Sequence, residues 1–165
     1  MWIKYSKFFL WVGYVYFSYL LLLITLQYIP YHTDVAFLRI KQEVIALNHY
    51  KIAFFTHVYT SIFLMIFGAF QFLNYIQKKY IKLHRISGRL YVGILLLFSG
   101  PSGMVMAYYA NGGILAQVSF LLLSTFWMLF TFLSLYFILK KQVIKHQKFA
   151  IRSFALTLSA ISLRL

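Results

Sequence analysis

The hydrophobic and charged positions divide the chain into long uncharged stretches joined by short basic segments. Three stretches carry no formal charge: 8–33, 52–77 and 90–139. A helix that crosses a bilayer needs about 20 apolar residues, so each of the first two stretches is long enough for one span. The third has 50 residues, and as one helix it would measure about 75 Å. Because that is more than twice the hydrocarbon thickness, the third stretch is predicted to fold back on itself.

A turn and a last apolar segment complete five predicted helices. Asn111-Gly112-Gly113 is the strongest turn signal within the third stretch. A final apolar segment starts near Phe149 and continues to the last residue. The pattern predicts an all-α protein with one transmembrane domain, and no soluble domain, over residues 1–165. Its helices are predicted at about 8–29, 52–76, 89–110, 114–139 and 149–165.

The segment between the first two predicted helices has its own periodicity. Phe37, Ile40, Val44 and Leu47 recur at helical spacing, and Thr33 or Asp34 is placed to cap a helix start. This pattern favours a short amphipathic helix on the membrane interface. A plain polar connection is an equally good interpretation of the same segment.

The amino-acid composition indicates that the predicted helices are embedded in a membrane. The chain is 62% hydrophobic and only 11% charged, whereas soluble domains are about a quarter charged. The net charge of +14 does not indicate a nucleic-acid partner, because the basic residues collect between apolar runs. The apolar helices are instead predicted to contact the lipid bilayer. The absence of cysteine excludes disulfides and thiolate sites, and two acidic residues are too few for paired-carboxylate catalysis.

The basic residues also predict an orientation. Lys and Arg concentrate on the cytoplasmic side of bacterial membrane proteins. With a cytoplasmic N-terminus, twelve of the sixteen basic residues fall inside and four outside, which predicts a multi-pass membrane protein whose two basic segments both face the cytoplasm. The inner set is Lys4, Lys7, Lys78, Lys79, Lys82, Arg85, Arg89, Lys140, Lys141, Lys145, Lys148 and Arg152, and the outer set is Arg39, Lys41, Lys51 and Arg164.

Two predicted helices carry small or polar residues on one face. His57, Ser61, Leu64, Gly68 and Gln71 recur at intervals of three or four, so this face is predicted to lie inside the bundle. An ionisable residue at membrane depth is a functional candidate, and a histidine bonded to a neighbouring helix is the alternative.

The next predicted helix places Gly93, Gly100 and Gly103 on one face, typical of close helix packing. Its Gly100-Pro101-Ser102-Gly103 also resembles the nucleophile motif of rhomboid-type intramembrane proteases, which makes a Ser102–His57 dyad a minor hypothesis.

Two histidines stand where basic segments meet apolar ones. His84 precedes the third predicted helix and His146 the fifth, on the same side of the membrane. Two imidazoles from different helices can ligate one haem iron, so the pair is a candidate metal site for haem b. Arg85, Arg89 and Arg152 would then pair with the haem propionates. Contact with anionic lipid headgroups is the alternative. His57 is predicted to lie almost a membrane thickness away, in a second site near His49.

Several short motifs resemble one family in consistent order over residues 55–165. They are GAFQF (68–72), HRISGRLYV (84–92), SGPSG (99–103), NGG (111–113), Trp127 and HQKFAIRSFALTLSAISLRL (146–165). Together they resemble the predicted bacterial membrane-protein family known as domain of unknown function 2306. The resemblance implies a multi-helix protein of the bacterial cytoplasmic (inner) membrane, with motif positions at His57, His84, Arg85, Gly88, Arg89, His146 and Arg152. The family normally continues into at least one further membrane helix where this sequence ends at Leu165. Phe149 and Ala150 depart from the tryptophan and methionine usual in the family.

The leading functional hypothesis is therefore a b-type haem protein that transfers electrons, with a quinone or a larger membrane complex as its partner. A non-enzymatic accessory or scaffold subunit of a membrane complex is the main alternative. An intramembrane serine hydrolase is the third.

Overall fold

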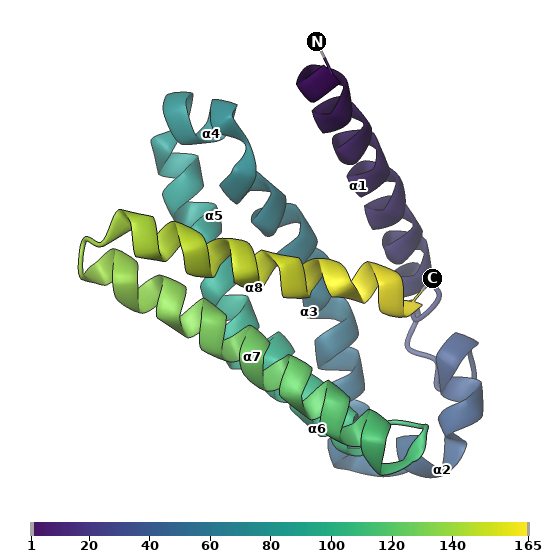
Figure 1. Ribbon diagram of the computed structural model, residues 1–165. Helices are drawn as coiled ribbons and strands as arrows, with labels where there is room; N and C mark the ends of the chain where they lie inside the picture. Colours follow the sequence, from purple (N-terminus) through teal and green to yellow (C-terminus); the bar gives the residue numbers. More distant parts are fainter. Residues whose placement is uncertain (1, 165) are drawn as a thin grey trace.

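The computed structural model describes the backbone of residues 2–164 and the side chains of residues 9–159. The described chain is helical throughout, without strands, as the sequence predicts (Figure 1). Four helical stretches are long and apolar enough to cross a membrane: Phe9–Leu26, Asn48–Phe72, Ile81–Tyr108 and Gly113–Leu139. They belong to α1 (Trp2–Leu26), α3 (Asn48–Phe72), the continuous series α5 (Ile81–Ile94), η2 (Leu95–Ser99) and α6 (Gly100–Tyr108), and α7 (Gly113–Leu139).

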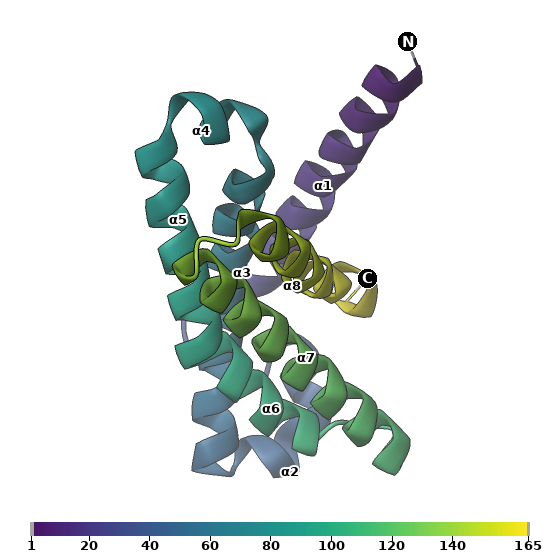
Figure 2. The ribbon, with the colours of Figure 1, turned by 60° about the vertical axis from the view of Figure 1, so that its left-hand side comes forward.

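The bundle is built around α3, which packs against α5, η2 and α6. On the other side of α6 lies α7, and α8 (Val143–Arg164) folds back along α7. Figures 1 and 2 both show the N-terminal half of α1 pointing away from this bundle. Only 6% of the α1 span is buried, against 44% of the α3 span, so most of the α1 span is not covered by the rest of the bundle.

The turn within the long third stretch is confirmed. Gly112 and Gly113 have φ angles of +103° and +74°, a conformation that favours glycine because it has no Cβ. The following helix, α7, begins at Gly113 and ends at Leu139, within one residue of the prediction.

Several predicted boundaries are wrong by three or more residues. The first helix covers Trp2–Leu26 rather than about 8–29, and the second begins at Asn48 rather than 52. The second predicted helix ends at Phe72 rather than 76, because Leu73 is extended and a separate helix α4 (Asn74–Lys79) follows. The predicted basic loop 77–89 is mostly helix, since α5 begins at Ile81. The last helix begins at Val143 rather than 149. Lysine and arginine are good helix formers, so an apolar run marks the part of a helix within lipid and not its ends.

The last helix is also less apolar than the other spans. Within the described residues, α8 is not among the helices apolar enough to cross a membrane. The structure therefore shows four such helices and a fifth long helix of mixed composition. Its polar positions face α7 and α5, through contacts described below.

A wider turn interrupts the third span just before its proline. Leu95–Ser99 form the π-helix η2, and Gly100-Pro101 follow at the start of α6. A proline ring clashes with a regular α-helical turn and lacks an N–H, so one wider turn accommodates it. A Cβ on Gly100 would lie 2.6 Å from Met128 Cγ, and one on Gly103 would lie 3.1 Å from His57 Cε1. Close packing at these two glycines is confirmed, whereas Gly93 has nothing within 4 Å of its Cβ position.

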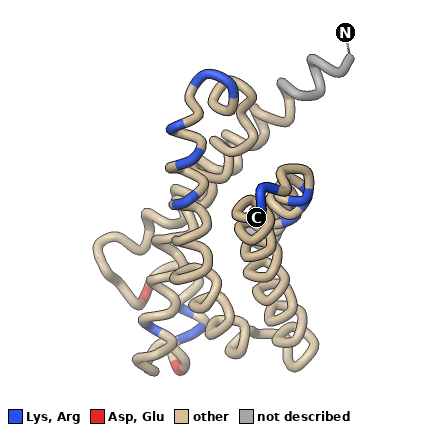
Figure 3. Tube along the Cα trace, turned by 90° about the vertical axis from the view of Figure 1, so that its left-hand side faces the viewer, with Lys and Arg blue, Asp and Glu red and all other residues tan. Residues whose placement is uncertain are grey.

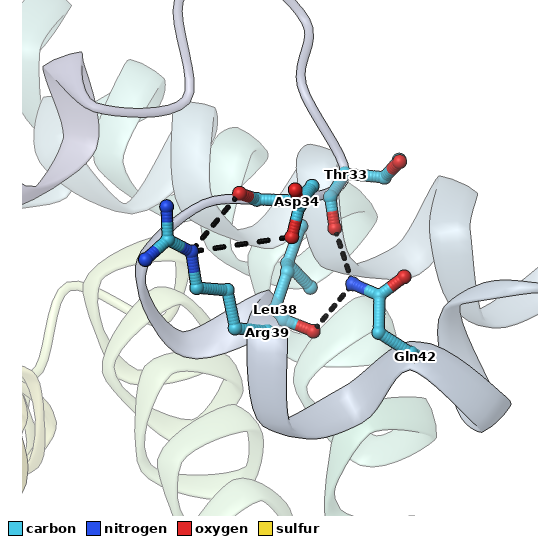
Figure 4. A network of polar contacts seen from close by, with 5 residues as sticks. All are labelled: Thr33, Asp34, Leu38, Arg39 and Gln42. Carbon is cyan, nitrogen blue, oxygen red and sulfur yellow. Dashed lines mark hydrogen bonds and ion pairs between the residues drawn. The ribbon is translucent and has the colours of Figure 1, made fainter.

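The connection between α1 and α3 is helical but not as predicted. It contains a 3-10 helix, η1 (Ala36–Lys41), and one turn of α-helix, α2 (Gln42–Ile45). Neither Thr33 nor Asp34 caps it through a side chain, because Val35 occupies the N-cap position. Instead, Gln42 Nε2 donates to the carbonyl oxygens of Thr33 (2.7 Å) and Leu38 (3.0 Å) (Figure 4). The side that packs inward is Leu38, Lys41 and Ile45, while the predicted apolar side (Phe37, Ile40, Val44 and Leu47) is exposed or half-buried.

The charged residues separate along the long axis of the bundle. Figure 3 shows lysines and arginines at the α4–α5 end and at the neighbouring α7–α8 turn. The few cations around η1 lie at the opposite end, together with both acidic residues. The side chains of Lys4, Lys7 and Arg164 lie outside the described residues. The two basic segments therefore share one end of the molecule, as the sequence predicts.

Candidate functional site

The fold places His84 and His146 on two helices that bond to each other, although 62 residues separate them in the chain. His84 lies in the first turn of α5, and His146 lies in the first turn of α8. Both side chains are half-buried. The sequence placed both histidines before their helices, whereas the structure places them inside, because each helix starts earlier than predicted.

Ser134 of α7 holds the His146 ring through Nδ1. That nitrogen lies 2.9 Å from the Ser134 carbonyl oxygen and 2.9 Å from its hydroxyl. A carbonyl oxygen only accepts, so Nδ1–H donates to it, and the hydroxyl is then directed to the His146 carbonyl, 3.5 Å away. In this arrangement a neutral His146 has its lone pair on Nε2, which is the tautomer of a typical metal-binding histidine.

His84 has a buried ring nitrogen without a partner. Its Nδ1 is inaccessible to solvent and makes no hydrogen bond to any described residue. The backbone around it is well fixed, because Gln71 Nε2 of α3 donates to Ser87 Oγ (2.7 Å) and to the His84 carbonyl (3.2 Å). Gly88 leaves space for that glutamine, since a Cβ there would lie 2.9 Å from Gln71 Oε1. A buried polar atom without a hydrogen-bond partner is uncommon in proteins, so this imidazole marks a candidate ligand site.

The three arginines lie on the same two helices as the histidines. Arg85 and Arg89 are exposed on α5, and Arg152 is exposed on α8. The Arg152 guanidinium lies over the Phe149 ring, 5.0 Å from its centroid. These side chains give this end of the bundle fixed positive charge.

A buried network of hydroxyl groups lies deeper between the same helices. Tyr91 Oη of α5 is 3.0 Å from Ser153 Oγ and 2.7 Å from Thr157 Oγ1 of α8. From α7, Thr131 Oγ1 is 2.6 Å from Ser153 Oγ, and Trp127 Nε1 donates to Thr157 Oγ1 at 3.0 Å. Sequence reasoning missed this network. The spacing of four between its members on each of α7 and α8 is the signal that was available.

His57 belongs to a different region of the molecule. Its Nδ1 is 2.9 Å from the Ser99 carbonyl oxygen, at the end of the π-helix. Ser99 follows His84 by 15 residues, which is about 22 Å along a helix. The predicted separation of His57 from the histidine pair is therefore confirmed. His49 does not join His57, because its Nε2 lies 2.6 Å from Tyr109 Oη.

The serine–histidine dyad finds no support in this geometry. Ser102 Oγ donates to the carbonyl oxygens of Phe98 (2.6 Å) and Ser99 (3.2 Å), while His57 bonds the latter carbonyl itself. A hydroxyl directed to its own helix backbone is a packing feature of membrane helices. The motif Gly100–Gly103 therefore serves helix packing and the wide turn.

These features define an integral membrane protein with several apolar helices and buried polar contacts between them. Residues 54–165 match the family described as "Predicted membrane protein (DUF2306)". The chain belongs to this family, as the motifs in its sequence suggest. No curated protein and no solved structure matches it.

Proposed function

We propose that this protein binds a b-type haem between α5 and α8 and transfers electrons at the bacterial cytoplasmic membrane. The observation that carries the proposal is that His84 and His146 lie in the first turns of α5 and α8, two helices joined by hydrogen bonds, where the bundle carries its basic segments. We include in the proposal that α8 crosses the membrane as a fifth span and that the basic end is cytoplasmic. The polar positions of α8 that bond α5 and α7 support its insertion, since they face protein rather than lipid.

The residues present fit this cofactor in two respects. The Ser134 carbonyl holds His146 Nδ1–H, which leaves Nε2 as the electron-pair donor. His84 would ligate through Nε2, since its Nδ1 is inaccessible to solvent. Haem, when bound, would supply a one-electron redox couple. Arg85, Arg89 and Arg152 would bind its propionates through paired hydrogen bonds.

The visible spectrum of the purified protein, before and after dithionite, tests the proposal. We expect sharp b-type bands in the reduced protein from cells supplied with haem, and loss of most of that signal in His84→Ala and His146→Ala. Arg89→Ala and Arg152→Ala should weaken haem retention but keep the band positions. His57→Ala is the matched control and should leave the spectrum unchanged, because His57 lies in a separate region.

A colourless wild-type protein would overturn the haem proposal and favour the second candidate, an accessory subunit of a membrane complex. One observation favours that role: α1 stands apart from the bundle, with most of its span uncovered (Figure 2). Tyr14 Oη donates to the Met65 carbonyl at 2.6 Å and joins α1 to α3. Leu21 and Ile24 also pack on the bundle, while most of the other described residues of the span are exposed or half-buried and can pack on lipid or on another helix.

A further inference from the structure

A cavity of about 640 Å³ is lined by α1, η1, α3, α6, α7 and α8, and it reaches from η1 at the end opposite the basic segments to Trp127 and Thr157 of the hydroxyl network. Its volume falls in the range of small-molecule sites, about 300–1,000 Å³. The lining is mainly apolar, with Leu21, Met65, Met106 and Leu156 among its residues. The cavity suits a ligand with an apolar body.

Lys41 lines the same cavity from η1 and is an unusual residue to find there. Its side chain is only 5% exposed, and its Nζ donates to the Tyr109 carbonyl oxygen beyond the last turn of α6. An ammonium has three N–H donors, and a buried one is costly unless it is paired with an opposite charge. Burial accordingly lowers the pKa of Lys41.

Neither acidic side chain of the chain supplies that charge. Asp34 pairs with Arg39, at 3.9 Å between Oδ1 and Nε, and no carboxylate within the described part of the chain lies within 4.0 Å of Lys41 Nζ. The segment is nonetheless held firmly, by the bonds of Arg39 to Asp34 and of Gln42 to Thr33 and Leu38 (Figure 4). The fold therefore keeps a buried cation at the cavity without a protein anion to match it.

The cavity continues from Lys41 toward the middle of the bundle. Tyr50 and Met65 both line it, and fifteen residues of helix α3 separate them, about 22 Å. One acyl chain spans half of the hydrocarbon core, about 15 Å, so a chain of that length fits. Ser61 Oγ, which is buried and has no hydrogen-bond partner among the described residues, offers a polar contact along the way.

We infer that this cavity binds an anionic amphiphile, with its carboxylate or phosphate head on Lys41 and its acyl chain running along α3 toward Met65. The site is independent of the histidine pair, so the haem proposal and this one stand or fall separately.

Trp127 lines the cavity and provides the test. The chain has three tryptophans, Trp2, Trp11 and Trp127, so a Trp2→Phe/Trp11→Phe background reports on Trp127 alone. Trace dibromostearate is added to this protein in detergent micelles, and a dibrominated phosphatidylglycerol is tested in parallel. Saturable quenching that unlabelled stearate or phosphatidylglycerol reverses is expected. The tighter of the two probes then identifies the carboxylate or the phosphate source.

Lys41→Met should weaken that binding by about tenfold or more, because a charge-assisted contact is lost. Lys41→Arg should keep most of it, and Lys51→Met, the same change at a neighbouring cation outside this cavity, should not alter it. Wild-type affinity in Lys41→Met would overturn the proposal. So would equal quenching by dibromostearate methyl ester and by the free acid in the unmodified cavity, a comparison that does not depend on the variant folding.

Discussion

At the residue scale, two glycines of the bundle differ in what surrounds them. A Cβ on Gly68 of α3 would lie 2.3 Å from Phe154 Cε2 and 3.2 Å from Tyr91 Cε2. Phe154 has little freedom to move, since its ring stacks on Phe72 with 4.9 Å between centroids. Gly93 of α5 has open space around its Cβ position. Gly68 and Gly93 both satisfy the sequence pattern for helix packing. They differ in that aromatic rings lie close to the Cβ position of Gly68 and nothing lies close to that of Gly93.

We therefore expect Gly68→Ala to destabilise the protein by about 1–3 kcal/mol, because overpacking forces rings apart. Gly93→Ala is the matched control and should be neutral or slightly stabilising, since alanine is the better helix former by about 1 kcal/mol. Thermal unfolding in detergent, followed by circular dichroism, measures both. An equal loss in the two variants would contradict the assignment of Gly68 to a tight helix contact.

At the element scale, the hydroxyl network explains how α8 is fixed to α5 and α7. α8 is less apolar than the other long helices, and its Ser153 and Thr157 side chains are buried. In a bilayer such groups need protein partners, because lipid provides none. Tyr91, Trp127 and Thr131 supply them. Hydrogen bonds between buried polar side chains therefore attach α8 to the bundle, whereas apolar packing attaches the other long helices.

Tyr91→Phe removes one hydroxyl that two partners share. We expect a loss of about 1 kcal/mol, the usual size for a hydrogen bond between membrane helices. Tyr19→Phe on the exposed face of α1 is the control and should change little. The unfolding free energies of Tyr91→Phe, of Thr157→Val and of the double variant give the coupling between the two hydroxyl groups. Additive effects in the double variant would show that Tyr91 and Thr157 act independently.

At the scale of the whole molecule, the charge distribution bears on orientation. The two basic segments share one end of the bundle (Figure 3), and such an end faces the cytoplasm under the positive-inside rule. The other end carries Asp34, Glu43 and the buried Lys41. The two proposed sites would then face opposite sides of the membrane.

The absence of cysteine in the natural chain allows a direct test of this orientation. Single cysteines at Lys79 and Lys141 should resist an impermeant thiol reagent in intact cells and react after permeabilisation. A cysteine at the exposed Glu43 should react in intact cells. Labelling of the first two positions without permeabilisation would reverse the proposed topology, and labelling of only one would place the two basic segments on different sides.

The sequence by itself determined the class of the protein and the four helices that are long and apolar enough to cross a membrane. Uncharged runs of fixed length follow from the thickness of the bilayer, and the left-handed turn at Gly112 and Gly113 follows from local backbone chemistry. The separation of His57 from His84 follows from helix rise alone. Helix ends were misplaced because lysine, arginine and histidine continue a helix beyond the lipid.

Only the tertiary structure decided which side chains meet. Ser134 holding His146 and the unpaired Nδ1 of His84 depend on contacts between helices distant in sequence. The burial of Lys41 depends likewise on a carbonyl 68 residues away. Helix periodicity gives the face on which a residue lies but not the partner across it, because one face can pack on several neighbours at different rotations. The shared end of the two basic segments was foreseeable from the sequence, whereas the lysine-lined cavity required the packed fold.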